Sequence, residues 1–356
     1  MRVNPKEVLK ALAAVQPGGE RRDIVALGRV KDLEVGDNRV SFAILLEDPS
    51  SPASAQLLDR ARAAIAALGV ADVRVSAASP QTAKMGSMSR NADLIPGVKS
   101  TIAVASGKGG VGKSTLAVNL AVALQRGGAK VGLMDTDVYG PSVPHLMGSR
   151  AGPVVVEGKI SPPVDHGVKM ISMAYFLPPG EAVIWRGPML HKAIHQFLGD
   201  VRWDELDYLV IDMPPGTGDI QLSLSQTIPL TGAVIVSTPQ DMALSVASKA
   251  IAMFNKLNVP ILGVVENMSY YSCPHCGQRE DIFGHGGARA AAEKMRLPFL
   301  GEIPLDVKIR QESDEGRPVA LDGSTACGKV FHEVAKAVVE QVERAQKRAA
   351  QEISIE

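Results

Sequence analysis

The sequence predicts an α/β protein: a mostly parallel sheet with helices on both faces, preceded by a small α+β domain. Three observations lead to this fold class. From residue 99 onward, short β-branched apolar runs alternate with helical segments, as in sheets whose crossover helices pack on each face. These runs lack polar alternation, which is typical of parallel strands covered on both sides. The first 77 residues mix helical and strand-like patterns.

The N-terminal part, residues 1–77, is expected to form the small domain because its apolar residues recur first at helical and then at strand-like spacing. The expected elements are a helix over Pro5–Val15, strands over Ile24–Lys31 and Arg39–Leu46, a helix over Ala53–Leu68 and a strand over Val73–Ser76. Residues 78–98 are rich in Ser, Ala, Gly, Pro and Met and lack apolar periodicity, which predicts a flexible linker. The larger domain is then expected over residues 99–356.

Composition narrows the class of protein. Lys plus Arg and Asp plus Glu both number 38, so no net field draws the molecule to nucleic acid or to an anionic membrane. Three cysteines in 356 residues do not resemble a secreted disulfide framework. Pro5 and Glu7 interrupt any signal-like start, and no apolar stretch is long enough to span a bilayer. We expect a soluble cytoplasmic protein without nucleic acid partners or stable membrane association.

A phosphate-binding loop follows the strand expected at Thr101–Ala105 and opens the helix expected from about Thr115. Its glycines let backbone N–H groups surround phosphate oxygens, and the helix N-terminus adds partial positive charge. Lys113 is expected to reach the β- and γ-phosphates, and the Ser114 hydroxyl to bind Mg²⁺. The expected nucleotide-binding residues of the loop are Gly107, Lys108, Gly109, Gly110, Val111, Gly112, Lys113, Ser114 and Thr115.

Carboxylates end two later strands. The run Val131–Met134 leads to Asp135-Thr136-Asp137, and the run Leu209–Ile211 leads to Asp212-Met213-Pro214-Pro215-Gly216. Since the carboxyl ends of parallel strands face the ligand crevice, both sets are expected beside the phosphate-binding loop. Asp212 is then expected near Mg²⁺, with Gly216 on a loop that senses the γ-phosphate.

A cysteine pair, Cys273-Pro274-His275-Cys276, is not part of a nucleotide-binding motif. Two thiolates separated by two residues can chelate one soft metal centre, but zinc or an iron-sulfur cluster needs four ligands. A second copy of the chain can supply the missing two. A redox dithiol and a structural zinc shared between two chains remain alternatives. Cys327 has no matching partner and is expected to be a buried or incidental thiol.

The run KGGVGKST, with its extra Lys108, resembles the deviant Walker A motif of the MinD/ParA-like ATPases. This resemblance implies a homodimer in which Lys108 reaches the partner's phosphates, and slow ATP hydrolysis with catalytic roles for Lys108, Lys113 and Asp137. It also implies that Asp137, in switch I, orients the attacking water. Asn267 resembles the family's adenine contact, and the Ile303–Asp306 turn its second base contact.

Further motifs narrow the resemblance to the Mrp/ApbC branch, the iron-sulfur cluster carrier proteins, over about residues 98–345. They are Asp135–Ser142, Trp185–Met189, Asp212–Asp219 and the cysteine pair Cys273 and Cys276, in that order. Residues 4–77 resemble iron-sulfur assembly factors, although the run DPSSPASAQLL lacks a cysteine that many relatives carry.

The resemblance implies an ATP-dependent carrier that binds a 4Fe-4S cluster between two chains and transfers it to apo-proteins, with an assembly scaffold as a further partner. The alternatives are a ParA/MinD-like positioning ATPase and a nucleotide-gated scaffold with structural zinc. The mixed charge of the C-terminal helical segment disfavours the positioning ATPase, which would need a basic surface. His191 and His195 lie one helical turn apart, but an exposed helix face explains them better than a metal site.

Overall fold

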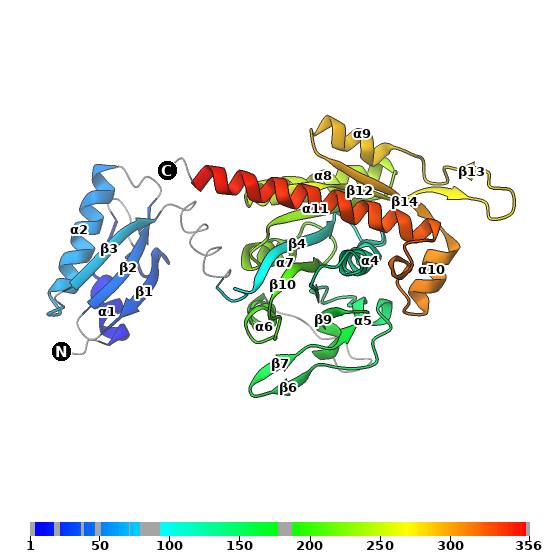
Figure 1. The fold of residues 1–356 in the computed structure, drawn as a ribbon. Coiled ribbons are helices and arrows are strands. Elements are labelled where there is room, and N and C mark those ends of the chain that lie inside the picture. Colours follow the sequence, from blue (N-terminus) through cyan, green and yellow to red (C-terminus); the bar gives the residue numbers. More distant parts are fainter. Residues whose placement is uncertain are drawn as a thin grey trace. The chain divides into compact units, whose positions relative to one another are not determined.

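A computed structural model describes residues 4–17, 22–36, 39–46, 51–70, 72–78, 93–176 and 187–353. The chain divides into two compact units, Met1–Ser89 and Arg90–Glu356 (Figure 1). Most of the expected linker, residues 79–92, lies outside the described residues, whereas residues 93–97 form turns within the second unit, before its first strand. Within the described part of the chain, none of the helices has the length and apolar character needed to span a bilayer.

The first unit packs helices against a small mixed sheet. Its sheet order is β1-β2-β3, with β1 and β2 antiparallel and β2 and β3 parallel. Val40, Phe42 and Ile44 alternate along β2 and share one buried cluster with Val8 and Leu12 of α1. The elements are α1 (Pro5–Leu12), β1 (Val30–Val35), β2 (Arg39–Leu45), α2 (Pro52–Ala66) and β3 (Asp72–Ala78).

The strand expected over Ile24–Lys31 is wrong over most of its length. The Asp23 carboxylate accepts hydrogen bonds from the N–H groups of Val25 and Ala26, at 2.9 and 2.8 Å, and this side-chain cap stabilises a turn. Gly28 follows at φ +64°, so the backbone enters the extended conformation only at Val30.

The second unit is built on one large sheet, and the prediction of a mostly parallel sheet is confirmed. The order within the described residues is β13-β12-β11-β4-β10-β5-β9-β8, with β14 added beside β12; only the β12–β13 and β8–β9 pairs are antiparallel. The strands are β4 (Val98–Ser106), β5 (Val131–Asp135), β8 (Val164–Asp165), β9 (Val168–Ser172), β10 (Leu206–Asp212), β11 (Gly232–Ser237), β12 (Ile261–Ser272), β13 (Arg279–Glu280) and β14 (Phe299–Leu305), with a separate hairpin β6 (Val154–Val156) and β7 (Lys159–Ser161).

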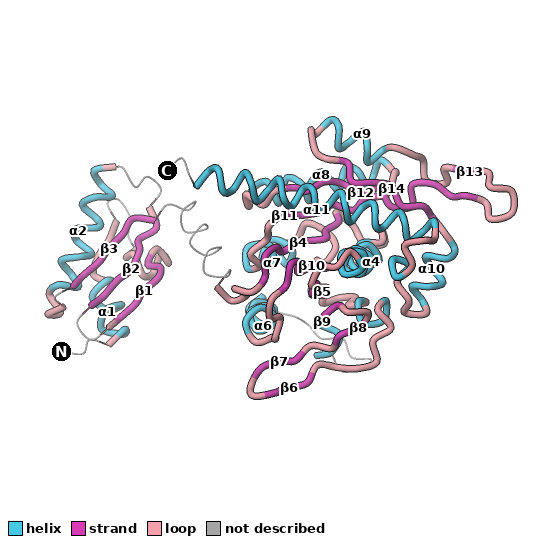
Figure 2. Tube along the Cα trace, viewed as in Figure 1, coloured by secondary structure: helices cyan, strands magenta, loops and turns pink. Residues whose placement is uncertain are grey.

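Helices cover both faces of this sheet, as Figure 2 shows. On one face, α4 and α11 pack together, and their apolar residues share a core with Ile102 and Val104 of β4. The alternate residues Ala103 and Ala105 are also fully buried, as expected for a strand in a sheet that is covered on both faces. The helices are α4 (Lys113–Arg126), α5 (Val143–Leu146), α6 (Gly187–Gly199), α7 (Asp219–Thr227), α8 (Asp241–Lys256), α9 (Gly287–Lys294), α10 (Val307–Asp314) and α11 (Ala326–Ile353).

The packing of α11 gives a stability prediction. Phe331 is 1% exposed in the core between α11 and α4, so Phe331→Ala should lower the free energy of unfolding of the second unit by about 3–5 kcal/mol. Both tryptophans of the sequence lie in residues 90–356, so tryptophan fluorescence during denaturant unfolding reports this unit. Lys336→Ala, on the exposed face of the same helix, is the control. Equal stability of the two variants would contradict this packing.

Candidate nucleotide site and cysteine hairpin

The phosphate-binding loop joins the carboxyl end of β4 to α4, at the centre of the sheet. Gly110 and Gly112 have φ values of +77° and +81°, a region that favours glycine. Gly112 is the N-cap of α4, and its carbonyl accepts the first helical bond from Leu116 N–H at 3.0 Å. The loop therefore presents backbone N–H groups and a helix N-terminus at one point, as an anion site requires.

Lys113 and two carboxylates meet below this loop. Lys113 as a whole residue is 6% exposed. Its ammonium lies 2.6 Å from Asp212 Oδ1 and 3.8 Å from Asp137 Oδ2, and it donates to Ser114 Oγ at 3.1 Å. A buried charge is tolerated only when it is paired. The structure thus brings together four of the residues that the sequence singled out.

Strand register places these groups. Asp212 at the end of β10 lies opposite Val104 of β4 on one side and opposite Asp135 of β5 on the other. Thr136, which follows Asp135, holds the end of β5 to the end of β10, because its N–H and its hydroxyl both donate to the Asp212 carbonyl, at 3.0 and 2.8 Å. Parallel strands that end together therefore gather the carboxylates at one edge of the sheet.

The carboxylates outnumber the cation that pairs with them. Burial raises the pKa of Asp212, against the attraction of Lys113. Burial, and next the charge of Asp212, raise the pKa of Asp135 to about 7. Within the described residues, Asp212 Oδ2 is buried without a hydrogen-bond partner. A divalent cation with oxygen ligands fits this arrangement, because it would supply both the missing positive charge and a partner for Oδ2.

Hydrogen bonds hold two loops beside the site, the turn after β5 and the loop after β10. Asp137 Oδ1 accepts from the N–H groups of Tyr139 and Gly140, at 3.1 and 3.2 Å, and so closes the turn after β5. Gly216, at φ +99°, donates its N–H to the Ser106 carbonyl at 3.0 Å. One loop therefore contacts the lysine of the phosphate-binding loop, and the other contacts the last residue of the strand before it.

Lys108 is half-buried and donates to the Gln240 side-chain oxygen of the same chain at 3.3 Å. Gln240 precedes α8 and was not expected at the site. Its position just beyond the carboxyl end of β11, next to β4 in the sheet, is the signal that could have found it. A long bond to a neutral amide holds the ammonium weakly, so this lysine is free to exchange partners.

Asn267 lies against the phosphate-binding loop, and its Nδ2 donates to the Val111 carbonyl at 2.8 Å. It is 8% exposed and lies opposite Ile303 of β14. Strand β12 continues past Asn267 to Ser272 through a bulge at Met268, whose φ is +56°. The expected second base contact is part of β14 up to Leu305, and Asp306 caps α10 by accepting from Lys308 N–H.

The cysteine pair closes a hairpin between β12 and β13. Gly277 N–H donates to the Cys273 carbonyl at 2.8 Å, and Cys273 N–H donates to the Gln278 carbonyl at 2.9 Å. Hydrogen bonds from the Cys276 backbone, the His275 backbone and the Cys276 thiol lower the pKa of Cys273. This favours the thiolate that binds metals.

The two thiols are accessible and incomplete as a metal site. Cys276 is exposed and Cys273 half-exposed. Among the described residues, the one group of three or more converging His, Cys, Asp or Glu side chains is Glu266, His285 and Glu302, so the pair lacks a third ligand from its own described chain. Cys327 is 6% exposed, and burial raises its pKa to about 11, which makes it a poor metal ligand.

The histidine pair on α6 does not form a metal site. His191 and His195 are exposed, and both ring nitrogens of His191 lie against hydroxyls, Nε2 against Ser223 and Nδ1 against Thr227 at 3.0 Å. These hydrogen bonds explain the ring without a metal.

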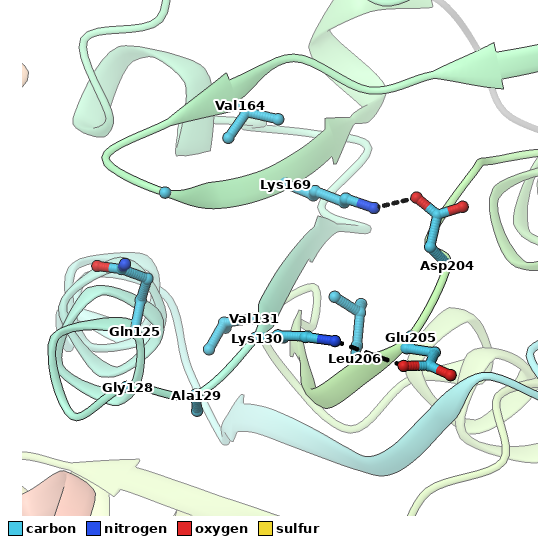
Figure 3. A pocket seen from close by; sticks show the side chains of 11 residues that line it. Gln125, Gly128, Ala129, Lys130, Val131, Val164, Lys169, Asp204, Glu205 and Leu206 are labelled. Carbon is cyan, nitrogen blue, oxygen red and sulfur yellow. Dashed lines mark hydrogen bonds and ion pairs between the residues drawn. The ribbon is translucent and has the colours of Figure 1, made fainter.

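A cavity of about 690 Å³ lies at the opposite, amino-terminal end of the strands (Figure 3). It is lined by residues of α4, β5 and β9 and by the loop before β10. Its charged side chains pair with each other, Lys169 with Asp204 and Lys130 with Glu205. No uncompensated charge among these lining residues is left for a ligand, so the chemistry lies at the carboxyl edge instead.

Gly112 permits a direct prediction. A Cβ at this position would come within 2.1 Å of Asn267 Nδ2. Gly112→Ala should therefore cost about 1–2 kcal/mol for the left-handed backbone and about 1 kcal/mol for the lost Asn267 bond, measured by unfolding of the nucleotide-free protein. Gly109→Ala is the control, because an added Cβ there meets nothing within 4 Å. If both variants unfold at the same denaturant concentration, Asn267 does not support the loop in this way.

Two family models match this chain. Residues 97–339 match the family model described as NUBPL iron-transfer P-loop NTPase, and residues 5–77 match the model described as iron-sulfur cluster assembly protein. A protein of Deinococcus radiodurans named iron-sulfur cluster carrier protein is 50% identical over 319 residues, which is 88% of each chain.

Two solved structures agree with the fold. A nucleotide-binding protein of Archaeoglobus fulgidus in complex with ADP is 40% identical, with a TM-score of 0.60, over 69% of this chain and 96% of that chain. The cell division ATPase MinD of Pyrococcus furiosus is 23% identical, with a TM-score of 0.51, over 68% and 99%; it shares the fold alone. The chain therefore belongs to the NUBPL iron-transfer P-loop NTPase family.

Proposed function

We propose that this protein is an ATP-dependent carrier that holds a 4Fe-4S cluster between two copies of the chain and transfers it to apo-proteins. One observation carries the proposal: a nucleotide site and half of a metal site share strand β12. Asn267 binds the phosphate-binding loop, and Cys273 follows the last residue of the same strand. The relatives named iron-sulfur cluster carrier proteins support the cargo.

ATP binding is expected to redistribute charge in the site. The Lys113 ammonium, now paired with Asp212, would turn to the β- and γ-phosphates, while the loop N–H groups bind phosphate oxygens. Ser114 and Asp212 would hold Mg²⁺, for which the unpartnered Asp212 Oδ2 is a suitable ligand. Bound there, Mg²⁺ neutralises charge on the phosphates.

Hydrolysis needs a positioned water and a stabilised transition state. Asp137, 3.8 Å from the Lys113 ammonium and 7% exposed, is suited to orient the water. Lys108 would leave Gln240 and reach the γ-phosphate bound by the second copy, which makes hydrolysis depend on the dimer. Asn267 would contact the adenine base, with Ile303–Asp306 nearby.

The cluster is cargo rather than a resident cofactor. Cys273 and Cys276 of each copy supply two thiolates, so two copies complete the four that a 4Fe-4S cluster requires. Because Cys276 is exposed, an apo-protein can approach a cluster held there. The N-terminal unit, which matches the assembly-protein model, is suited to contact the scaffold that supplies clusters. We place this cycle in the cytoplasm.

Anaerobic reconstitution with iron and sulfide tests the cargo. The protein should gain a broad absorbance band near the visible blue, with equal iron and sulfide contents, and Cys273→Ser or Cys276→Ser should abolish it. Cys327→Ser should keep the band, because Cys327 is buried whereas Cys276 is exposed. A wild-type protein that binds zinc alone, or no metal, would overturn the carrier function in favour of a structural zinc scaffold or a positioning ATPase.

Phosphate release tests the ATPase cycle. Lys113→Ala should remove activity, and Lys108→Ala should lower kcat by about 10³-fold or more, as loss of a cationic finger does. Gln240→Ala, which removes only the present partner of Lys108, should keep most of the activity. Full activity in Lys108→Ala would contradict a role for this lysine across the dimer.

Activity that rises more than linearly with protein concentration is expected for wild type, since each site needs a second copy.

A further inference from the structure

Strand β12 links the two sites, but its backbone alone does not fix the cysteine hairpin. Asn267 and Cys273 are six residues apart, roughly 20 Å along an extended strand. Between them the register with β14 shifts and Met268 adopts φ +56°. A bulge of this kind bends a strand and increases its twist. Beyond the bulge β12 rejoins β14 where Tyr271 lies opposite Leu305, so side-chain contacts add to this pairing in holding the hairpin in a defined orientation.

A polar cluster lies beside this bulge. It consists of Glu266, Ser269, His285 and Glu302, which we call the carboxylate cluster. Glu266 is fully buried next to Asn267 and accepts from Ser269 Oγ at 2.6 Å and from the N–H groups at the start of α9, of Gly286 and Ala288, at 2.9 and 2.6 Å. Glu302 of β14 lies opposite Glu266 and 2.9 Å from Ser269 Oγ. The cluster is thus fixed to the nucleotide end of β12.

Arg279 reaches this cluster from the cysteine hairpin. It lies three residues after Cys276 and opposite Ser272, the last residue of β12. Its guanidinium stacks on the Tyr270 ring at 3.9 Å, donates to His285 Nδ1 at 2.8 Å and lies 3.7 Å from Glu302 Oε2. One side chain therefore joins the hairpin to β12, to β14 and to the loop before α9.

A metal ion is a weaker explanation of the same cluster. Ligand atoms of Glu266, His285 and Glu302 lie within 4.8 Å of one another. However, Glu302 has guanidinium groups on both oxygens, since Arg289 lies 3.6 Å from Oε1, and Glu266 is occupied by three donors. Positive charge and hydrogen-bond donors are already supplied by the chain.

We propose that Arg279 is a positioning residue that couples the nucleotide site to the cysteine pair by locking the hairpin onto the carboxylate cluster; this rests on the proposed function of the pair. Without Arg279, the backbone bonds of Cys273 with Gly277 and Gln278 still close the turn. The two thiols then stay together, but their orientation no longer follows the nucleotide end of β12. Glu302 keeps Arg289, so the fold survives.

Thiol alkylation of the full-length, cluster-free protein tests this coupling, with rates at Cys273 and Cys276 resolved by peptide mass spectrometry. In wild type, Mg-ATP should slow alkylation at least about fivefold, the lower range of allosteric couplings. In Arg279→Gln the rate should be the same with and without Mg-ATP, while nucleotide affinity is unchanged. Arg279→Lys should restore the effect only partly, because lysine lacks the planar guanidinium that stacks and donates at once.

Arg289→Gln is the matched control. Arg289 shares Glu302 with Arg279, stacks on Phe299 at 4.2 Å and has a similarly exposed side chain, 49% against 43%, but it lies on α9 rather than on the hairpin. It should behave as wild type. A nucleotide effect that persists in Arg279→Gln, that is lost equally in Arg289→Gln, or that is absent in wild type would overturn the coupling. Cluster absorbance in the same proteins judges the carrier function separately.

Discussion

The buried pair between the Lys113 ammonium and the Asp212 carboxylate, 2.6 Å apart, is the interaction on which the nucleotide site depends. Two charges out of water are tolerated only as partners, so either one alone would destabilise the site. The pair is incomplete, because Asp212 Oδ2 lacks a partner within the described residues and the Asp137 carboxylate lies 3.8 Å from the same ammonium. A phosphate for the lysine and a divalent cation for the carboxylates would satisfy all these groups together. The fold supplies this arrangement through register, since β4, β10 and β5 end side by side.

Strand β12 connects the nucleotide site to the cysteine hairpin. Its first half is an ordinary buried strand beside β11, and its second half continues beyond the nucleotide site to the cysteine hairpin. The bulge at Met268 separates Asn267, which donates to the phosphate-binding loop, from Ser269 of the carboxylate cluster. A change at the loop therefore has a short covalent route to the thiols, and the side chains beside the bulge decide whether the route is stiff.

Motifs made of neighbouring residues could be predicted from the sequence, whereas contacts that depend on tertiary pairing could not. The glycines, Lys113 and Asp212 could be singled out because strand, loop and helix follow each other directly in sequence, and the structure brings Lys113, Ser114, Asp137 and Asp212 together. The two cysteines could be singled out from their spacing. Gln240 was missed because its partner, Lys108, is distant in sequence. Arg279 was missed because its contact with Glu302 depends on strand pairing. The strand expected at Ile24–Lys31 failed because one carboxylate, Asp23, stabilised a turn against β-branched propensity.

The central claim is that one cluster requires two chains, because each chain contributes two thiolates. Native mass spectrometry of the reconstituted protein measures this most directly, since it weighs intact complexes with their metal content. The account predicts a dimer carrying a single 4Fe-4S cluster and no cluster on monomers. A monomer that retains a cluster, or a dimer with one metal ion bound to each chain, would contradict it.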